Sequence, residues 1–260
     1  MRSMALAATL ALIVAHATQA MAGPPAEIAG TWDVEHVRVD DRDALRWNFK
    51  PDDPQLVGRT LIISSEKVRF EEGKAIGCVQ NSWQLRRTTW SLLFSKGFAR
   101  ARREGVRSNA VPTDYDTKVS ARGQTTAYEI CPPEKTARNQ FPNDHWVALQ
   151  EPGLLLLRLD DMTLLVLRRR EPNAAPKASF DCQKATTPTE KAICASHDLA
   201  SWDRSVAAAF RNAIQRREPE EVAQIRAQQK AWLHERDACG AETACIDEHQ
   251  WRRVEDLVQE

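Results

Sequence analysis

The chain has 260 residues, and its 36 basic and 36 acidic residues leave no formal net charge. This length accommodates two modest domains. The sequence contains no Gly-rich phosphate-binding loop and no HExxH, CxxC or GxSxG motif, so it offers no catalytic constellation and no metal-ligand set. We therefore expect neither an enzyme nor a cofactor or metal, and no nucleic-acid partner.

The N-terminus, residues 1–22, has the pattern of a secretory signal peptide. Arg2 precedes an apolar run over residues 4–15, and a small-x-small motif ends at Ala22. The run is too short for a stable transmembrane anchor, and no cysteine near Ala22 could carry a lipid. We expect cleavage after Ala22 and a periplasmic or secreted protein, a setting in which six cysteines can form disulfides.

Residues 23–171 are expected to form an antiparallel β domain. Short segments rich in β-branched, aromatic or leucine residues are separated by turns such as Glu72-Gly73 and Pro152-Gly153, a pattern typical of a sandwich or a closed barrel. The last two segments, joined by Asp160-Asp161-Met162, are expected to form a hairpin. The predicted strands are 31–39, 59–64, 67–71, 82–87, 125–131, 145–150, 153–159 and 163–169.

Gly30-Thr31-Trp32 is a Gly-x-Trp motif on the first strand, and Arg168 stands at the end of the last strand. In these two features the first domain resembles the lipocalin or calycin barrels. In that family the indole closes the base of the barrel, and the arginine packs across it as a cation on an aromatic face. The resemblance gives these structural roles to Trp32 and Arg168. Other small barrels remain open as alternatives.

Cys78 and Cys131 each adjoin a predicted strand. A Cys78–Cys131 disulfide would close a loop of about fifty residues and stabilise the fold by ~4 kcal/mol, through the entropy of the unfolded chain. We expect this pair to have a role in stability.

The segment 86–107 is strongly basic, with aromatic residues interleaved and Glu104 as its only acid. One interpretation is an amphipathic excursion that binds an anionic component of the cell envelope. The other is a solvated basic insertion whose aromatic side chains pack onto the barrel. Residues 108–116 are expected to form a loop.

Residues 172–177 have the composition of an exposed linker, so a second domain is expected over residues 178–260. Apolar residues at helical spacing predict a small bundle, which at roughly eighty residues gains much of its stability from disulfides. The predicted helices cover 188–195, 198–217, a segment that starts at Glu218-Pro219, and about 243–258. The packing face of the third helix comprises Val222, Ile225, Gln229, Trp232, Leu233 and Arg236.

The four cysteines of the second domain adjoin helix ends. Thr187 and Glu190 have the spacing of a capping box, and Gly240 follows Cys239 where a left-handed helix cap is favoured. Four cysteines allow three pairings, and the sequence does not choose among them. The simplest pairing has two local disulfides, Cys182–Cys194 and Cys239–Cys245.

A set of residues at fixed offsets runs from about residue 178 to the C-terminus: Phe180-Asp181-Cys182, Glu190 to Cys194, Leu199, Asp203, Gln229, Trp232, Arg236, Asp237, Cys239 and Cys245. In these residues the sequence resembles the LprI-type lysozyme-inhibitor domain, a small helical domain of exported bacterial proteins. Trp202 replaces a small aliphatic residue of the family pattern and Phe210 a common tyrosine, but both keep the packing face apolar.

We select Trp202, Asp203, Trp232, Arg236 and Asp237 as candidate binding residues. A structural interpretation stands beside this one, in which Asp203 and Arg236 pair between the two long helices and both tryptophans lie in the core. If either tryptophan is exposed, it becomes a candidate anchor for a partner, because exposed aromatic residues are enriched at interface centres.

The resemblance implies an exported binding protein that inhibits lysozyme, whose two catalytic carboxylates lie in a cleft. A rigid loop could fill that cleft and meet the carboxylates with hydrogen-bond donors, and we expect the loops 182–187 and 240–243 to do so. Beyond Asn173 the chain carries 12 basic and 15 acidic residues, a mild excess that suits a cationic lysozyme.

The alternative function belongs to another class. A lipocalin-like carrier or sensor would hold a small apolar or envelope-derived ligand in its barrel, with the helical domain as a docking module. An internal apolar cavity would favour this alternative, whereas a barrel filled by its own side chains would count against it.

Overall fold

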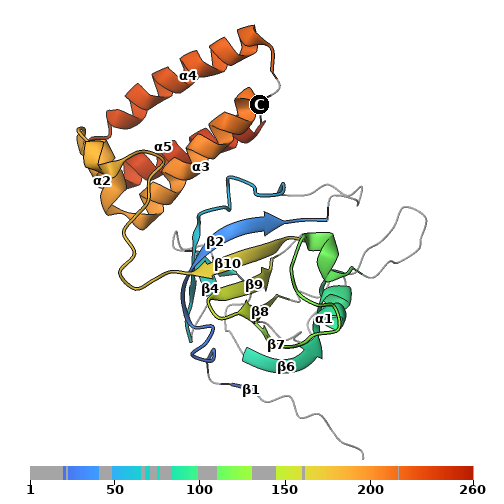
Figure 1. The fold of residues 1–260 in the computed structure, drawn as a ribbon. Helices are drawn as coiled ribbons and strands as arrows, with labels where there is room; N and C mark the ends of the chain where they lie inside the picture. The colour runs from blue at the N-terminus through green and yellow to red at the C-terminus, as the bar shows by residue number, and fades with distance from the viewer. Residues whose placement is uncertain are drawn as a thin grey trace, which may run out of the picture.

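The computed structural model describes residues 20–21, 23–40, 49–65, 68–70, 75–76, 83–98, 110–130, 145–159, 162–215 and 217–259. In these residues the fold is α+β, as expected: an antiparallel sheet is followed by a separate group of helices (Figure 1). The strands are β1 Ala20–Met21, β2 Gly30–Arg38, β3 Thr60–Ile63, β4 Val68–Phe70, β5 Ala75–Ile76, β6 Trp83–Thr89, β7 Gln124–Glu129, β8 Trp146–Glu151, β9 Leu154–Arg158 and β10 Leu164–Arg169. The helices are α1 Trp90–Gly97, α2 Pro188–Ala195, α3 His197–Ile214, α4 Pro219–Asp237 and α5 Thr243–Gln259, with short 3₁₀ turns at Pro112–Tyr115 and Cys182–Lys184.

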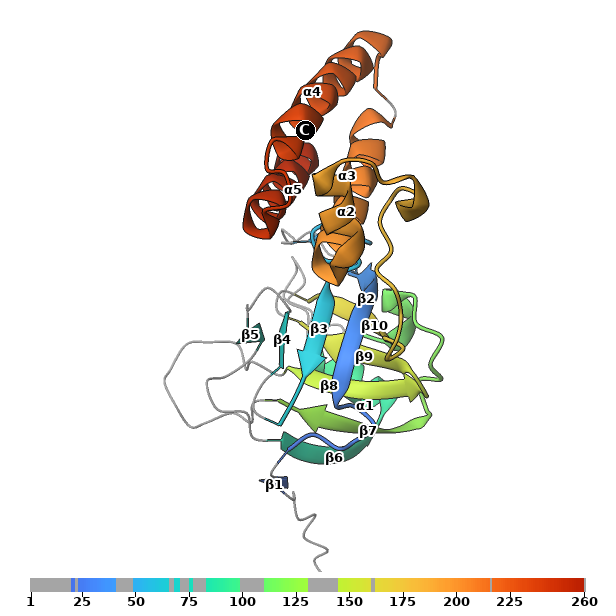
Figure 2. The same ribbon diagram turned by 90° about the vertical axis from the view of Figure 1, so that its left-hand side faces the viewer.

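The strand order in the sheet is β1-β6-β7-β8-β9-β10-β2-β3-β4-β5. Most neighbours are consecutive in the chain, but β10 returns to pair with β2. Because the last strand joins the first long strand, the sheet curls as a barrel does (Figure 2). Within the described residues, β5 pairs only with β4 and β6 only with β1 and β7. The described part of the sheet is thus a curled, open form of the expected barrel.

The central strands are buried on both faces. Successive side chains of a strand point to opposite faces, so Leu155 and Leu157 of β9 enter one apolar cluster, whereas Leu154 and Leu156 enter another. This explains the continuous leucine run in the sequence, which is typical of a strand covered on both sides.

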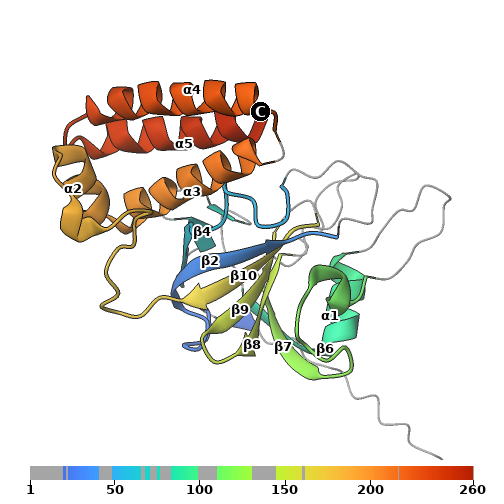
Figure 3. The same cartoon turned by 45° about the horizontal axis from the view of Figure 1, so that its top comes forward.

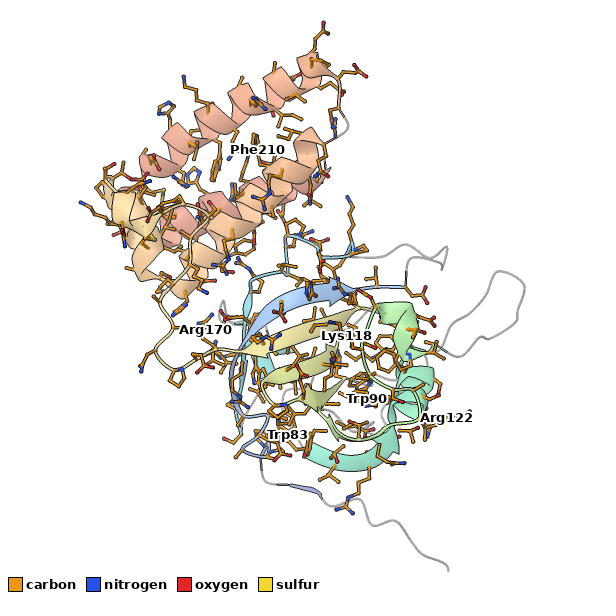
Figure 4. The ribbon with its side chains drawn as sticks, in the orientation of Figure 1. Trp83, Trp90, Lys118, Arg122, Arg170 and Phe210 are labelled. Atoms are coloured by element: carbon orange, nitrogen blue, oxygen red, sulfur yellow. A yellow bond between two sulfur atoms is a disulfide. The ribbon has the colours of Figure 1, made fainter. Side chains whose placement is uncertain are left out.

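The inner cluster fills the concave face of the curled sheet with side chains that include the fully buried Trp32 and Trp83. Trp83 is labelled in Figure 4. A concave face packed in this way weighs against the carrier alternative.

The outer cluster is covered by α1, which lies within the basic segment 86–107. Thr89 caps the helix by accepting a hydrogen bond from the Leu92 backbone N–H. Trp90, Phe94 and Phe98 are buried against the sheet. In the described part of this segment, the aromatic residues therefore pack inward, as the second of the two interpretations requires.

Residues 99–107 lie outside the described residues, so the binding of an anionic envelope component stays a prediction. The expected loop 108–116 contains the 3₁₀ turn Pro112–Tyr115. Tyr115 contacts the aromatic cluster, with its ring centroid 4.2 Å from that of Phe98. This contact explains why the segment folds back onto the sheet.

Trp32 has the structural role expected of it, but its cationic partner is Arg169. Trp32 is fully buried, and its indole N–H donates to the Ile28 carbonyl at 2.9 Å. The Arg169 guanidinium carbon lies 4.2 Å from the indole centroid, whereas Arg168 pairs with Glu35 at 2.9 Å on a solvent-exposed face. The prediction for Arg168 was wrong by one residue, because the register places Arg169 opposite Trp32 and alternation turns Arg168 to the other face.

Gly30 leaves room for this arrangement. Its φ of +127° is a conformation that residues with a side chain rarely adopt, and a Cβ here would lie 2.9 Å from the Arg169 Nη1 atom. The Gly-x-Trp motif therefore has a steric cause, since the glycine admits the guanidinium that covers the indole.

Arg59, just before β3, joins the sheet to the helices. Its side chain is 1% exposed, and the Nη2 atom donates to the hydroxyl oxygens of Ser201 at 2.7 Å and Ser205 at 3.2 Å, both on α3. The Asp198 carboxylate lies 3.7 Å from Nη1, and the guanidinium carbon lies 3.5 Å from the centroid of the Trp202 ring. A residue just before strand β3 thus places its charge among four side chains of one helix.

The backbone beside Arg59 supports the same contact. Gly58 has a φ of +84°, and its carbonyl accepts a hydrogen bond from the Ser201 hydroxyl. A Cβ at Gly58 would lie 3.1 Å from the Ser201 Oγ atom. The chain end of β10 adds a further anchor, because Arg170 bonds to Asp33 where the strand leads into residues 172–177 (Figure 4).

We predict that Arg169→Ala lowers the free energy of unfolding by ~2 kcal/mol, because it removes the cation from a desolvated indole face and two hydrogen bonds to backbone carbonyls. Arg168→Ala is the matched control, and its exposed ion pair with Glu35 should contribute less than ~1 kcal/mol. Urea unfolding of both variants measures the difference. Equal losses would contradict the assignment of Arg169.

We predict that Arg59→Ala uncouples the sheet from the helices. The variant leaves Asp198 and two serine hydroxyls without their buried cation, a loss of ~3 kcal/mol. Differential scanning calorimetry should then resolve two unfolding transitions in place of the coupled one of the native protein. Lys50→Ala, which removes a weak exposed contact to Val258, should leave the transitions unchanged. A single unshifted transition in Arg59→Ala would refute this role.

Candidate functional site at the stapled end of the helices

The helices form the expected small bundle. α3 packs against α5, and α4 runs beside α5 on the side away from the sheet (Figure 3). Val206, Ile225 and Val254 belong to the shared core, and Phe210 lies at its margin between α3 and α4 (Figure 4). The prediction that Leu233 belongs to the packing face was wrong, since Leu233 is 36% exposed. The buried residues of α4 are Ile225, Trp232 and Arg236, so the core side of this helix is narrow.

Both local disulfides are present, Cys182–Cys194 and Cys239–Cys245, so the simplest pairing of these four cysteines is confirmed. The predicted Cys78–Cys131 disulfide lies outside the described residues. Each observed disulfide closes a short loop, because the paired cysteines are 12 and 6 residues apart.

The two disulfide-closed loops lie together. α2 sits at one end of the bundle beside the turn between α4 and α5 (Figure 3). The Thr189 hydroxyl, buried at the start of α2, donates to the Gly240 carbonyl at 2.8 Å. Gly240 adopts the expected left-handed conformation, with a φ of +61°. We call residues 181–187 and 239–243 together the stapled end.

Glu190 fixes the first loop of the stapled end through the predicted capping box. The Thr187 hydroxyl accepts from the Glu190 N–H at 3.1 Å, and the Glu190 carboxylate accepts from the N–H groups of Thr187 at 3.0 Å and Thr186 at 2.7 Å. These backbone hydrogen bonds favour the ionised carboxylate and so lower the pKa of Glu190 from its ordinary value of 4.5.

The predicted pair between Asp203 and Arg236 is present in the interior of the bundle. Arg236 Nη1 lies 3.6 Å from the Asp203 carboxylate, and both side chains are at most 7% exposed. Arg236 Nη2 donates to Asp237 at 2.8 Å, and Asp203 accepts from the Ser179 backbone N–H at 2.6 Å. These three candidate residues therefore form one network that holds the chain before α2 against α3 and α4.

The two candidate tryptophans occupy different places. Trp232 is 8% exposed, donates to the His249 carbonyl at 3.2 Å and has the Arg236 guanidinium carbon 5.3 Å from its ring. Trp202 is half-buried beside Arg59 at the contact with the sheet. The structure thus unites Trp232, Arg236, Asp203 and Asp237 and leaves Trp202 apart, and a role in partner binding stays a prediction for all five.

Sequence reasoning missed two groups. Arg59 was assigned only to a strand, although Ser201 and Ser205, four residues apart on one face of α3, offered a faint signal that polar atoms would be met there. Lys184 was inside an expected contact loop but was not singled out. Its side chain is 84% exposed, and Lys184 is the one lysine or arginine in residues 181–187 and 239–243.

Cys239, Cys245 and His249 place their potential ligand atoms within 4.8 Å of one another. The two sulfurs are bonded to each other, whereas a metal is bound by thiolates. In the oxidised protein this cluster is therefore a disulfide beside a histidine.

We predict that Glu190→Gln loses stability relative to the native protein at neutral pH and that this difference disappears in acid. The folded protein lowers the pKa of Glu190, so the ionised carboxylate stabilises the fold above the ordinary value of 4.5, and the effect is lost as the pH falls through the lowered value. Urea unfolding of both proteins, from neutral pH to well below pH 4.5, measures the difference in their free energies of unfolding. In Glu242→Gln, whose carboxylate accepts no hydrogen bond within the described residues, the difference should stay small at every pH. A gap in Glu190→Gln that persists in acid would contradict the prediction.

No described helix is long and apolar enough to cross a membrane. No curated protein and no solved structure matches the chain. The lipocalin resemblance of the sheet therefore stays a prediction. Residues 182–257 match the family model of Lysozyme inhibitor LprI. This segment contains the two disulfides, the capping box and the Asp203–Arg236–Asp237 network.

Proposed function

We propose that this protein is an exported inhibitor of lysozyme that occludes the active-site cleft with its stapled end. The observation that carries the proposal is the match of residues 182–257 to an inhibitor family, in a segment whose two disulfide-closed loops meet at one end of the bundle. The predicted signal peptide, with cleavage after Ala22, accounts for a location in the periplasm or outside the cell.

Rigidity is the first requirement of such an inhibitor. A loop that is already ordered loses little conformational entropy when it enters a cleft. Both loops of the stapled end are closed by disulfides, joined by the Thr189–Gly240 hydrogen bond and capped by Glu190. The contact surface is therefore held in shape before it meets lysozyme.

Charge is the second requirement. Lysozyme uses two carboxylates in its cleft, and a cation that donates hydrogen bonds to them gains a charge-assisted contact. The Lys184 ammonium is exposed and lies 3.7 Å from its neighbour Asp181, a weak surface pair that can be exchanged for a carboxylate of the enzyme. We assign Lys184 the central contact.

The helical region as a whole carries a net charge opposite in sign to that of Lys184. Beyond Asn173 the chain has 15 acidic and 12 basic residues. A mildly acidic surface attracts a cationic lysozyme during approach, while a single exposed lysine meets the carboxylates at the centre of contact. Attraction and docking thus use different residues.

We predict that the purified mature protein slows the lysis of cell walls by lysozyme at stoichiometric amounts, in competition with a chitooligosaccharide bound in the cleft. Lys184→Glu should weaken inhibition about tenfold or more, because it sets a carboxylate against the two of the enzyme. Turbidity assays at several inhibitor concentrations give the inhibition constants.

Lys230→Glu is the matched control, since Lys230 is exposed on α4. It changes the net charge equally and should retain inhibition. Failure of the native protein to inhibit any lysozyme type would refute the function. Inhibition that Lys184→Glu and Lys230→Glu reduce equally would refute the assignment of the stapled end.

A further inference from the structure

A cavity of about 380 Å³ lies where the helices meet the sheet region, a size within the range of small-molecule sites. α4 is the helix farthest from the sheet in Figure 1, and α3 and α5 contribute the helical wall. The cavity is lined mainly by aromatic and acidic side chains: Phe49, Phe70, Trp202, Trp251, Asp247 and Glu255. None of these residues belongs to the stapled end.

One face of α5 supplies the acidic part of the lining. Asp247, Trp251 and Glu255 are spaced four residues apart, which stacks their side chains along one side of a helix. The cavity therefore contains a tryptophan flanked on either side by a carboxylate. Phe49 and Phe70 face this row from the sheet region.

The charges of the lining are not balanced. Its cation, Arg59, faces Asp198 at 3.7 Å and two serine hydroxyls of α3. Within the described residues, neither Asp247 nor Glu255 forms an ion pair. Two carboxylates of the cavity thus remain for a positively charged ligand.

Asp247 is partly buried, whereas Glu255 is exposed, and both line the cavity. Burial raises the pKa of the Asp247 carboxyl, and the Arg59 charge and the Trp202 indole N–H oppose that rise. A ligand that donates a charge-assisted hydrogen bond to this carboxylate acts in the same direction, because it favours the ionised form.

We propose that this cavity binds a small organic cation that joins a primary ammonium group to an aromatic or aliphatic body. The ammonium donates to the Asp247 carboxylate and lies near Glu255, and the body packs against Trp251 and Phe70. A cation on an aromatic face is the favoured arrangement in such a lining. The lining already contains one such contact, because the Arg59 guanidinium carbon lies 3.5 Å from the Trp202 ring centroid.

The test uses the full mature chain and two probes of equal size. Phenethylamine is protonated at neutral pH, and 2-phenylethanol is its neutral counterpart. Titration followed by tryptophan fluorescence and calorimetry should show saturable binding of phenethylamine at least about tenfold tighter than that of 2-phenylethanol, the gain expected of a charge-assisted hydrogen bond.

Asp247→Asn should weaken the binding of phenethylamine about tenfold while leaving 2-phenylethanol unaffected. The matched control is Glu248→Gln, because Glu248 is exposed on α5 and pairs with Arg252. If circular dichroism shows that Asp247→Asn does not fold, Glu255→Gln replaces it, with an expected loss of about threefold.

Equal binding of the two probes would overturn the proposal, as would unchanged binding of phenethylamine in the cavity variants. Saturable binding of an uncharged chitooligosaccharide that Asp247→Asn does not weaken would overturn it in favour of a saccharide site. The inhibition of lysozyme rests on the stapled end, so its loss or retention in these variants is a separate result.

Discussion

The Arg59 guanidinium is the contact on which the relative position of sheet and helices depends. A buried charge is tolerated only when polar partners compensate for its lost hydration, and α3 provides Arg59 with two hydroxyls, a carboxylate and an indole face. These four groups are in register with Arg59 only in one orientation of the helix. That orientation directs α5 toward the sheet region and forms the cavity with Asp247.

The helical region combines this long-range contact with local cross-links. Each disulfide spans one helix end, and Glu190 satisfies the backbone N–H groups that its own loop would leave unpaired. The buried Asp203–Arg236–Asp237 network then joins three segments of the chain. The disulfide-closed loops and the buried polar network together stabilise the shape of a bundle with a small apolar core.

Local patterns predicted the four C-terminal helices, the two local disulfides and eight of the strands, β2 to β4 and β6 to β10, because caps, spacing and alternation act between near neighbours. What escaped prediction depends on register or distance. Arg168 and Arg169 are indistinguishable until the β10–β2 pairing is known, and Leu233 fits the helical spacing of a face that α4 does not bury. The contact of Arg59 with Ser201 spans 142 residues, so no local pattern reveals it. The cavity follows from that contact and was equally hidden.

The depth at which Arg59 lies has a consequence for how such proteins can be rearranged. A helical segment that matches a family model by itself suggests a domain that could be separated from the sheet or fused to another protein. Here, separation would hydrate a guanidinium on one piece and uncover Trp202 with two serines on the other. A new partner for the helices would therefore need a buried cation that meets the same face of α3.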